Sequence, residues 1–172
     1  SGTIYNLSFS GRTSRVNSQL LGMHNISNHL AAAGLCLAAG IDFKTVVTGL
    51  ERLEHVPGRL EPIRCGQPYA VLVDYAHTDD ALANVLSTLK PLCLGKLCVV
   101  FGCGGDRDKT KRPRMAKVAQ DLADKVIVTN DNPRTENPDS IINDILAGFT
   151  NVSADTVSVE PDRTKAIEMA IA

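Results

Sequence analysis

From residue 69 onward, short apolar runs alternate with amphipathic segments, and this alternation constrains the fold more than any other feature. The runs are predicted strands at 69–74, 96–101, 125–129 and 156–160, and the predicted helices lie at 79–92, 113–123, 138–147 and 161–172. Strands that are apolar along their whole length are typical of parallel sheets that helices cover on both faces. The sequence therefore predicts an α/β fold with right-handed strand–helix–strand connections.

The first 57 residues have a different pattern, with a predicted strand at 3–9, a turn and loop at 11–22, and helices at 25–39 and 42–53. The first helix has Ile26, Leu30, Ala33 and Leu37 on one face and ends before Gly40. In the second helix, Asp42 is the predicted N-cap, and Val46, Val47 and Leu50 should point inward. Residues 55–59 interrupt the helical pattern with a Pro-Gly pair and mark a linker.

Composition excludes several classes of protein. The chain has 172 residues and a formal net charge of −1, which gives no general attraction to nucleic acid or membrane. No apolar run approaches the roughly 18 residues that a membrane span needs. The five cysteines form no CxxC pair, and Cys36, Cys93 and Cys98 lie in apolar surroundings, so we expect small buried side chains rather than metal ligands. That usage fits a reducing cytoplasm.

In a parallel sheet, ligands bind beyond the carboxyl ends of the strands, and three unusual loops follow three successive predicted strands. Residues 74–80 contain Asp74 and His77. Residues 102–112 hold three glycines, which let a ligand approach the backbone, followed by a cationic run that suits an anion. Residues 129–136 contain Asn132 and Arg134 on either side of Pro133, which stiffens the turn. We expect all three loops at one edge of the sheet.

Each loop also has an ordinary interpretation. The first is a helix cap by Thr78 or Asp79 beside an exposed histidine, the second a solvated glycine turn, and the third a plain Asn-Pro turn. The sequence has no GxxxxGK[ST] motif for cradling phosphates and no HExxH or GxSxG motif. It begins on a strand-like stretch and stops inside a helical pattern. We therefore expect a fragment of a longer protein that is inactive alone.

Five segments together resemble the Mur ligase family, and most closely its members that add diaminopimelate to peptidoglycan precursors. They are HNISN at 24–28, VPGRLE at 56–61, VDYAHTDDAL at 73–82, VFGCGGDRDK at 100–109 and DNPR at 131–134. The segments come in the family's order and cover roughly residues 20–150. One position departs from the family, because Thr78-Asp79-Asp80 stands where Thr-Pro-Asp is usual.

The resemblance implies a three-domain enzyme, of which this chain is a part. Residues 1–57 would be the helical tail of the central ATP-binding domain, and residues 58–172 most of a Rossmann-like C-terminal domain that brings the amino acid. The implied reaction uses ATP and Mg²⁺ to convert the free carboxylate of UDP-MurNAc-L-Ala-D-Glu to an acyl phosphate, which the amine of meso-diaminopimelate attacks. The magnesium ligands would lie mostly outside this chain. The implied enzyme is cytoplasmic and monomeric.

The resemblance also implies residue roles. Asn25, Asn28, Arg59, Asp74, Tyr75 and His77 match positions near the nucleotide, and Arg59, Asp74 and His77 are the candidate catalytic residues. Arg107, Asp131, Asn132, Pro133 and Arg134 match the amino-acid site. Diaminopimelate carries a distal carboxylate that lysine lacks, and a guanidinium binds a carboxylate with two parallel hydrogen bonds. If Arg134 is buried, lysine would leave it without a partner, at a cost of about 1–3 kcal/mol. The DNPR motif therefore predicts diaminopimelate.

Other interpretations remain open at this point. Related ATP-dependent ligases are a lysine-adding member of the family, a cyanophycin synthetase or a folylpolyglutamate synthetase, although the DNPR motif argues against folates. A non-catalytic domain that binds a nucleotide is another possibility. A Rossmann dehydrogenase is disfavoured because no GxGxxG follows the first predicted strand.

Overall fold

The structure is a computed structural model that describes residues 2–150 and 153–172. The chain forms two compact units, Ser1–Tyr75 and Ala76–Ala172. None of the described helices is long and apolar enough to cross a membrane.

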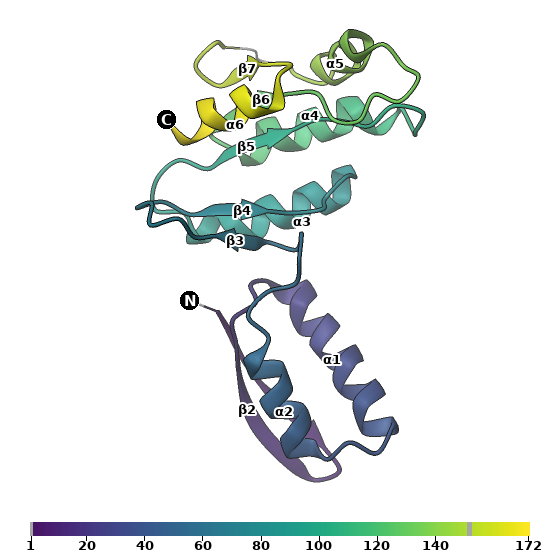
Figure 1. The fold of residues 1–172 in the computed structure, drawn as a ribbon, viewed down its shortest axis with the longest axis vertical. Coiled ribbons are helices and arrows are strands. Elements are labelled where there is room, and N and C mark those ends of the chain that lie inside the picture. The colour runs from purple at the N-terminus through teal and green to yellow at the C-terminus, as the bar shows by residue number, and fades with distance from the viewer. Residues whose placement is uncertain (1, 151–152) are drawn as a thin grey trace. The chain divides into compact units, whose positions relative to one another are not determined.

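The first unit begins with a β-hairpin (Figure 1), in which β1 (Thr3–Phe9) pairs antiparallel with β2 (Arg12–Ser18). The prediction of a loop over 11–22 was therefore wrong. The two turn residues, Ser10 and Gly11, have φ of 48° and 77°, which matches the two-residue turns that join twisted strands. The sequence concealed β2 because its seven residues include a single apolar side chain, Val16, which is completely buried.

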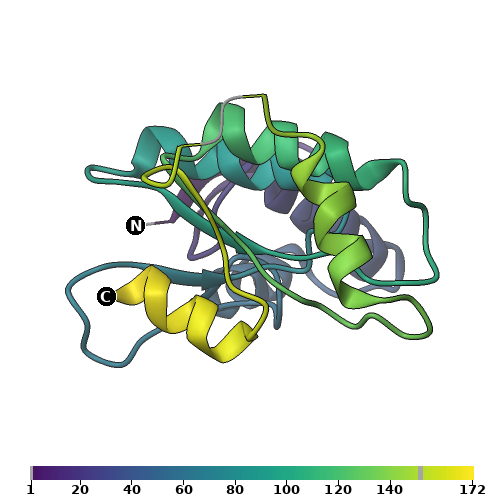
Figure 2. The same ribbon diagram turned by 90° about the horizontal axis from the view of Figure 1, so that it is seen from above.

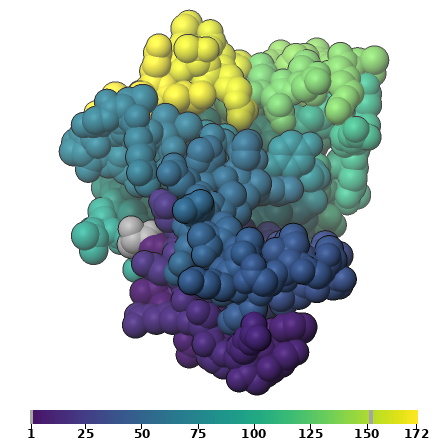
Figure 3. All heavy atoms as spheres, turned by 60° about the horizontal axis from the view of Figure 1, so that its bottom comes forward, coloured from purple at the N-terminus to yellow at the C-terminus, as the bar shows by residue number. Residues whose placement is uncertain are grey.

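Two helices pack on this hairpin, α1 (Met23–Ala38) and α2 (Phe43–Arg52). The space-filling view shows the hairpin in purple directly against the blue residues that follow it (Figure 3). The N-cap prediction is confirmed, since Asp42 Oδ1 accepts hydrogen bonds from the amides of Lys44 (3.0 Å) and Thr45 (3.1 Å). The three residues of α2 that were expected to point inward are all buried.

The buried line of α1 matches the prediction only at Ala33. It runs through Asn25, His29 and Ala33, whereas Leu30 is half exposed. His29 stays inside because its Nδ1 is 2.8 Å from the hydroxyl of Tyr5. Burial lowers the pKa of His29, which favours its neutral form. His29 therefore faces the interior, whereas the apolar pattern predicted that its neighbour Leu30 would do so.

The first unit ends in a second antiparallel pair, β3 (Glu61–Ile63) with β4 (Val71–Val73). The prediction had placed 69–74 as a buried strand of the parallel sheet. The strand exists, but it is only three residues long, partly exposed, and in a separate two-stranded sheet. A short apolar run has the same appearance in either sheet, so its partner could not be predicted from its composition.

The second unit contains the parallel sheet. Its strands lie side by side in the order β5 (Cys98–Phe101), β6 (Lys125–Val128), β7 (Val157–Val159). The helices are α3 (Asp79–Leu89), which continues into the short 3₁₀ helix η1 (Lys90–Leu92), α4 (Lys111–Leu122), α5 (Pro138–Leu146) and α6 (Arg163–Ile171). Figure 2 shows α3, α4 and α5 on one side of the strands and α6 on the other. The predicted α/β fold with helices on both faces is confirmed.

The core of this unit joins the sheet to the helices through apolar side chains that are almost completely buried. They include Leu86 of α3, Met115 of α4, Val126 and Val128 of β6, and Ile145 of α5. Cys103 is buried here, and desolvation raises the pKa of its thiol to about 11, so it stays protonated and packs as a small apolar group. Cys36, Cys93 and Cys98 are half-buried rather than buried.

Candidate functional site

The loops after β5 and β6 lie side by side at the carboxyl edge of the parallel sheet. The amide of Gly105 donates to the carbonyl of Asn132 (2.9 Å), and Nη1 of Arg134 donates to the carbonyl of Gly105 (2.6 Å). These two predicted loops therefore meet as expected.

Glycine is required in this contact because the two backbones nearly touch. A Cβ atom on Gly105 would lie 1.9 Å from the carbonyl oxygen of Pro133, and one on Gly102 would lie 2.3 Å from that of Thr129. Both distances are far below van der Waals contact, and the obstructing atoms belong to the backbone. These glycines therefore serve the contact between the loops, whereas the sequence had suggested a close approach to a ligand.

A reciprocal set of side-chain bonds locks the same two loops together. Asp106 accepts hydrogen bonds from the amide (3.2 Å) and the hydroxyl (2.7 Å) of Thr135, and its own amide donates to Oε1 of Glu136 (2.7 Å). Arg112, at the start of α4, makes two parallel bonds to the Glu136 carboxylate, at 2.8 and 3.0 Å. We call Asp106, Arg112, Thr135 and Glu136 the loop clasp.

The Glu136 carboxylate is the centre of the clasp. Its hydrogen bonds from Arg112, and next from Lys109, lower its pKa to about 2. The contacts with Glu136 and Asp144 in turn raise the pKa of Arg112. The pair is thus fully ionised at neutral pH, and its geometry is the bidentate one that guanidinium and carboxylate favour.

This pKa shift predicts how acid affects stability. A carboxylate with a depressed pKa in the folded protein stabilises the fold above its unfolded pKa and loses that contribution as the pH falls through its folded value. We therefore expect Glu136→Gln to lower the midpoint of urea unfolding at pH 7, with the difference from the parent shrinking between pH of about 4.5 and about 2. The control is Glu168→Gln, at an exposed position of α6. A constant difference across that range would show that Glu136 stabilises by shape alone.

The cationic run at 107–114 has less free charge than its sequence indicated. Lys111 and Arg112 are buried, and the exposed Lys109 and Arg114 are paired with Glu136 (3.0 Å) and Asp79 (2.9 Å). Arg107 is exposed and forms no ion pair with any residue that the structure describes. Of the five cations, Arg107 is therefore the best placed to receive an anionic ligand.

The DNPR loop presents its polar side chains to solvent. Asp131, Asn132 and Arg134 are exposed and Pro133 is half-buried. The loop also bonds to itself, since the amide of Asn132 donates to Asp131 Oδ1 (2.8 Å) and that of Arg134 to Asn132 Oδ1 (3.3 Å). The expectation of a buried Arg134 was wrong, because the residue is exposed, with a left-handed backbone at φ 51°.

His77 lies just before α3, at an exposed position. Thr78 is the N-cap of this helix and accepts from the amide of Ala81 (3.2 Å), so the ordinary interpretation of this segment as a helix cap is confirmed. The backbone carbonyl of His77 accepts a hydrogen bond from the side chain of the buried Lys111 (2.6 Å). Lys111 thereby fixes the backbone of His77 relative to the start of α4.

The remaining candidates lie in the first unit. Arg59 follows a Pro57-Gly58 turn, in which the Arg59 amide donates to the carbonyl of Val56 (3.0 Å), and its guanidinium lies 5.4 Å from the centre of the Tyr75 ring. This distance suits a cation–π contact. Asp74 follows β4, and its Oδ2 accepts from the amide of Leu60 (2.8 Å). The expectation that the Asp74 loop continues the parallel sheet was wrong, because β4 pairs with β3.

Asn25 and Asn28 lie one turn apart on α1. Asn25 is buried and donates to the carbonyl of Leu21 (2.8 Å), and its Oδ1 accepts from Nδ2 of Asn28 (3.3 Å). Asn28 is exposed. Asn25 therefore orients the side chain of Asn28, and only Asn28 is exposed to a ligand.

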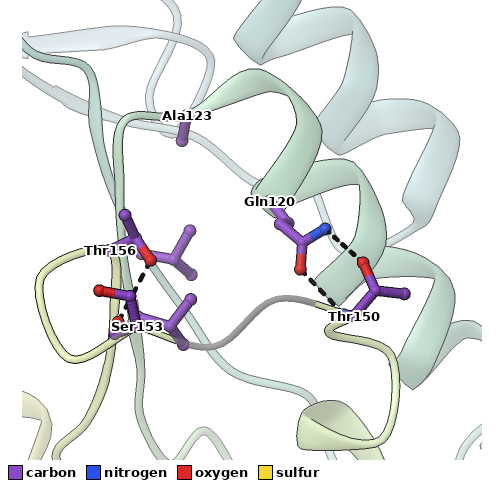
Figure 4. A pocket seen from close by; sticks show the side chains of 7 residues that line it. Gln120, Ala123, Thr150, Ser153 and Thr156 are labelled. Carbon is purple, nitrogen blue, oxygen red and sulfur yellow. Dashed lines mark hydrogen bonds between the residues drawn. The ribbon is translucent and has the colours of Figure 1, made fainter.

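A hollow in the described surface lies away from these loops. It measures about 670 Å³ and is lined by Gln120 and Ala123 at the end of α4, Val126 of β6, Thr150 and Ser153 between α5 and β7, and Thr156 and Val157 at the start of β7 (Figure 4). These residues mark the amino edge of the sheet, opposite the clasped loops. None of the predicted site residues lines it.

The clasp was missed from the sequence. Thr135 and Glu136 were read only as the end of a turn, and Arg112 as one more cation for an anionic ligand. The partners are 24 to 30 residues apart in the chain, and a single sequence does not show which charges pair. The one available signal was a cation in the first turn of α4, where the helix dipole disfavours positive charge unless an acid compensates it.

Comparison of the sequence with known proteins identifies its family. The family described as "Mur ligase, glutamate ligase domain" matches residues 58–172. A UDP-N-acetylmuramoyl-L-alanyl-D-glutamate--2,6-diaminopimelate ligase of Fusobacterium nucleatum is 47% identical over 164 residues, which are 95% of this chain and 33% of that protein. The ligase of the same name from Bacillus licheniformis is 48% identical over 171 residues, 99% of this chain and 34% of that protein. The chain thus spans about a third of these relatives.

The fold is also similar to that of solved structures from this family and from a related one. A structure titled as a UDP-N-acetylmuramoyl-L-alanyl-D-glutamate--2,6-diaminopimelate ligase has a TM-score of 0.63 and 42% identity, and the match covers 96% of this chain and 34% of that one. A folylpolyglutamate synthase of Mycobacterium tuberculosis, complexed with ADP, has a TM-score of 0.76 at 25% identity and covers 98% of this chain and 37% of that one.

Proposed function

Because the chain belongs to the Mur ligase family, we propose that it is part of an ATP-dependent ligase that adds meso-diaminopimelate to UDP-MurNAc-L-Ala-D-Glu. The relatives that match almost its whole length carry that name. The observation that carries the proposal is the carboxyl edge of the parallel sheet, where neighbouring loops present two exposed arginines, Arg107 and Arg134.

The chemistry of the amino acid explains this arrangement. Both lysine and diaminopimelate bring an amine that attacks and a carboxylate beside it, but diaminopimelate alone carries a second carboxylate at its far end. Two guanidinium groups on one edge match two carboxylates. We assign Arg107 and Arg134 to these carboxylates, and the exposed oxygens of Asp131 and Asn132 to ammonium groups, with Pro133 holding the turn.

The proposed reaction makes an amide bond in two steps. The free carboxylate of the UDP-linked dipeptide attacks the γ-phosphate of ATP and gives an acyl phosphate and ADP. The amine of diaminopimelate attacks the acyl carbon, loses a proton, and the tetrahedral intermediate expels phosphate. Positioning dominates such reactions, since holding two reactants in contact is worth about 7–11 kcal/mol. The part of this chain is to bring the amine to the acyl carbon.

We assign the nucleotide side to Arg59, Asp74, Tyr75 and His77, with Asn28 and its neighbour Asn25. Arg59 is exposed and Tyr75 steadies it, which suits contact with phosphate oxygens. The solved relative that holds ADP supports ATP as the nucleotide. Within residues 2–150 and 153–172, no three acidic, histidine or cysteine side chains are grouped to hold a metal. We propose, as the resemblance implies, that the Mg²⁺ ligands belong to another part of the enzyme.

We retain the boundary at 57/58 as a proposal: residues 1–57 are the tail of the ATP-binding domain, and 58–172 belong to the amino-acid-binding domain. A monomeric enzyme in the cytoplasm fits a reaction between ATP, a UDP-linked sugar and a free amino acid.

The test is ligation by the full-length enzyme. We expect it to release phosphate and form the UDP-MurNAc-tripeptide from ATP, Mg²⁺ and UDP-MurNAc-L-Ala-D-Glu when meso-diaminopimelate is supplied. With lysine in its place, kcat/KM should fall at least about 100-fold, because the charge-assisted hydrogen bonds from arginine to the distal carboxylate are not made. A preference for lysine would refute the substrate, and nucleotide binding without any ligation would indicate the non-catalytic alternative.

A further inference from the structure

Arg112 is an arginine that no ligand can reach. Its side chain has no exposed surface, and its guanidinium is surrounded by protein groups. Nη1 bonds to Glu136 (3.0 Å) and Asp144 (2.8 Å), and Nη2 bonds to Glu136 (2.8 Å) and lies 3.4 Å from the carbonyl of Gly104. A direct contact with substrate is thereby excluded, and any role of Arg112 in the reaction must pass through its partners.

Its main partner stands two residues after Arg134. Glu136 is the last residue of the segment that carries the DNPR motif, and the first turn of α5 begins at Pro138. Its carboxylate receives the two bonds from Arg112, one from Lys109 (3.0 Å) and one from the amide of Asp106 (2.7 Å). The position of this carboxylate therefore sets where the DNPR loop ends.

Stability alone does not account for the buried ion pair between Arg112 and Glu136. Replacing a buried ion pair by apolar side chains of similar volume is often neutral or stabilising. Arg112 also keeps its buried Nε without a hydrogen-bond partner among the described residues, which adds to its cost. A buried charge kept at such a cost is better explained by the geometry that it imposes, because a bidentate pair fixes both distance and orientation.

We propose that Arg112 is a positioning residue for the amino-acid site. Through Glu136 it holds residues 131–135 against the loop of Gly105, so that Arg134 faces the distal carboxylate of the incoming amino acid. The inference rests on the proposed function and goes beyond it, since it gives amino-acid selectivity to a side chain that never touches the amino acid.

The test is steady-state kinetics of the full-length ligase carrying Arg112→Lys. An ammonium keeps the charge but has no planar fork, so the two parallel bonds to Glu136 are lost. We expect the KM for meso-diaminopimelate to rise about tenfold, with kcat and the KM for ATP within about twofold, since a small displacement of a substrate-holding group weakens binding strongly. The preference for diaminopimelate over lysine should fall by the same factor.

Arg114→Lys is the matched control, because it is the same exchange on the same helix at an exposed ion pair with Asp79. It should leave the KM for diaminopimelate unchanged, since exposed pairs contribute little. A merely structural Arg112 would instead lower the amount of active enzyme and leave both KM values and the amino-acid preference as they were, and that result would overturn the proposal. If Arg112→Lys does not fold, Glu136→Asp shortens the same contact, and the same expectations apply to it. A parent enzyme that does not ligate diaminopimelate would refute the proposed function instead.

Discussion

Replacing Arg134 by alanine in the full-length ligase is expected to lower kcat/KM for meso-diaminopimelate by at least about 100-fold, while kcat/KM for lysine, already low, stays nearly constant. Two charge-assisted hydrogen bonds to the distal carboxylate are lost, and each is worth about 1.5–3 kcal/mol. Alanine has a Cβ like arginine, so the left-handed backbone at this position, φ 51°, costs about as much in both. The measurement is the rate of phosphate release with each amino acid.

The control for this prediction is Arg163→Ala. Arg163 is also exposed, and its Nη1 donates to a backbone carbonyl beside the same loop, that of Asn130 (3.3 Å). It should leave both rates within about twofold, as surface substitutions usually do. If the two variants behave alike, or if Arg134→Ala slows both amino acids equally, Arg134 does not read the distal carboxylate.

Gly105→Ala is expected to separate the two loops. The added Cβ would meet the carbonyl oxygen of Pro133 at 1.9 Å, and only backbone movement relieves such an overlap. We expect the free energy of unfolding to fall by about 1–3 kcal/mol, the cost of overpacking, and ligation to fall to background because the amino-acid site is no longer assembled. Urea unfolding of the chain and ligation by the full-length enzyme are the two measurements.

Gly95→Ala is the matched control for that substitution. Gly95 belongs to the same unit, has no neighbour within 4 Å of an added Cβ, and has no positive φ. This variant should be as stable as the parent or slightly more so, because alanine lowers the entropy of the unfolded chain. An active and stable Gly105→Ala protein would mean that the close approach of the loops is not needed.

The sequence was most informative where local chemistry decides structure. The strands and helices of the second unit, the N-cap Asp42 and the helix end at Gly40 all follow from residue preferences within one turn of chain, and the structure agrees. The hairpin strand β2 was missed because a polar strand with one apolar residue has almost no periodic signal. β4 was assigned to the wrong sheet, since pairing is decided by distant residues.

In the candidate site too, features set by local sequence could be predicted, and features set by distant residues could not. The edge of the sheet and the residues of its loops could be predicted from the order of strands and the positions of glycine, proline and arginine. The exposure of Arg134 and the burial of Arg112 could not, because both depend on contacts with residues far along the chain, such as Gly105 and Glu136. The five cations of 107–114 were equivalent in the sequence, and only the fold shows that four of them are buried or in ion pairs, whereas Arg107 is exposed and forms no ion pair with a described residue.

The clasp has a consequence for how new specificities could arise. It anchors the DNPR loop from its last residues, Thr135 and Glu136, whereas the Arg134 side chain contributes one hydrogen bond, to Gly105. Under the proposed function, recognition of the amino acid and anchoring of the loop therefore fall to different side chains. Under the proposed function, a single exchange at position 134 would change which amino acid is accepted while the clasp still holds the loop, so that specificity could change in one mutational step without loss of the folded enzyme.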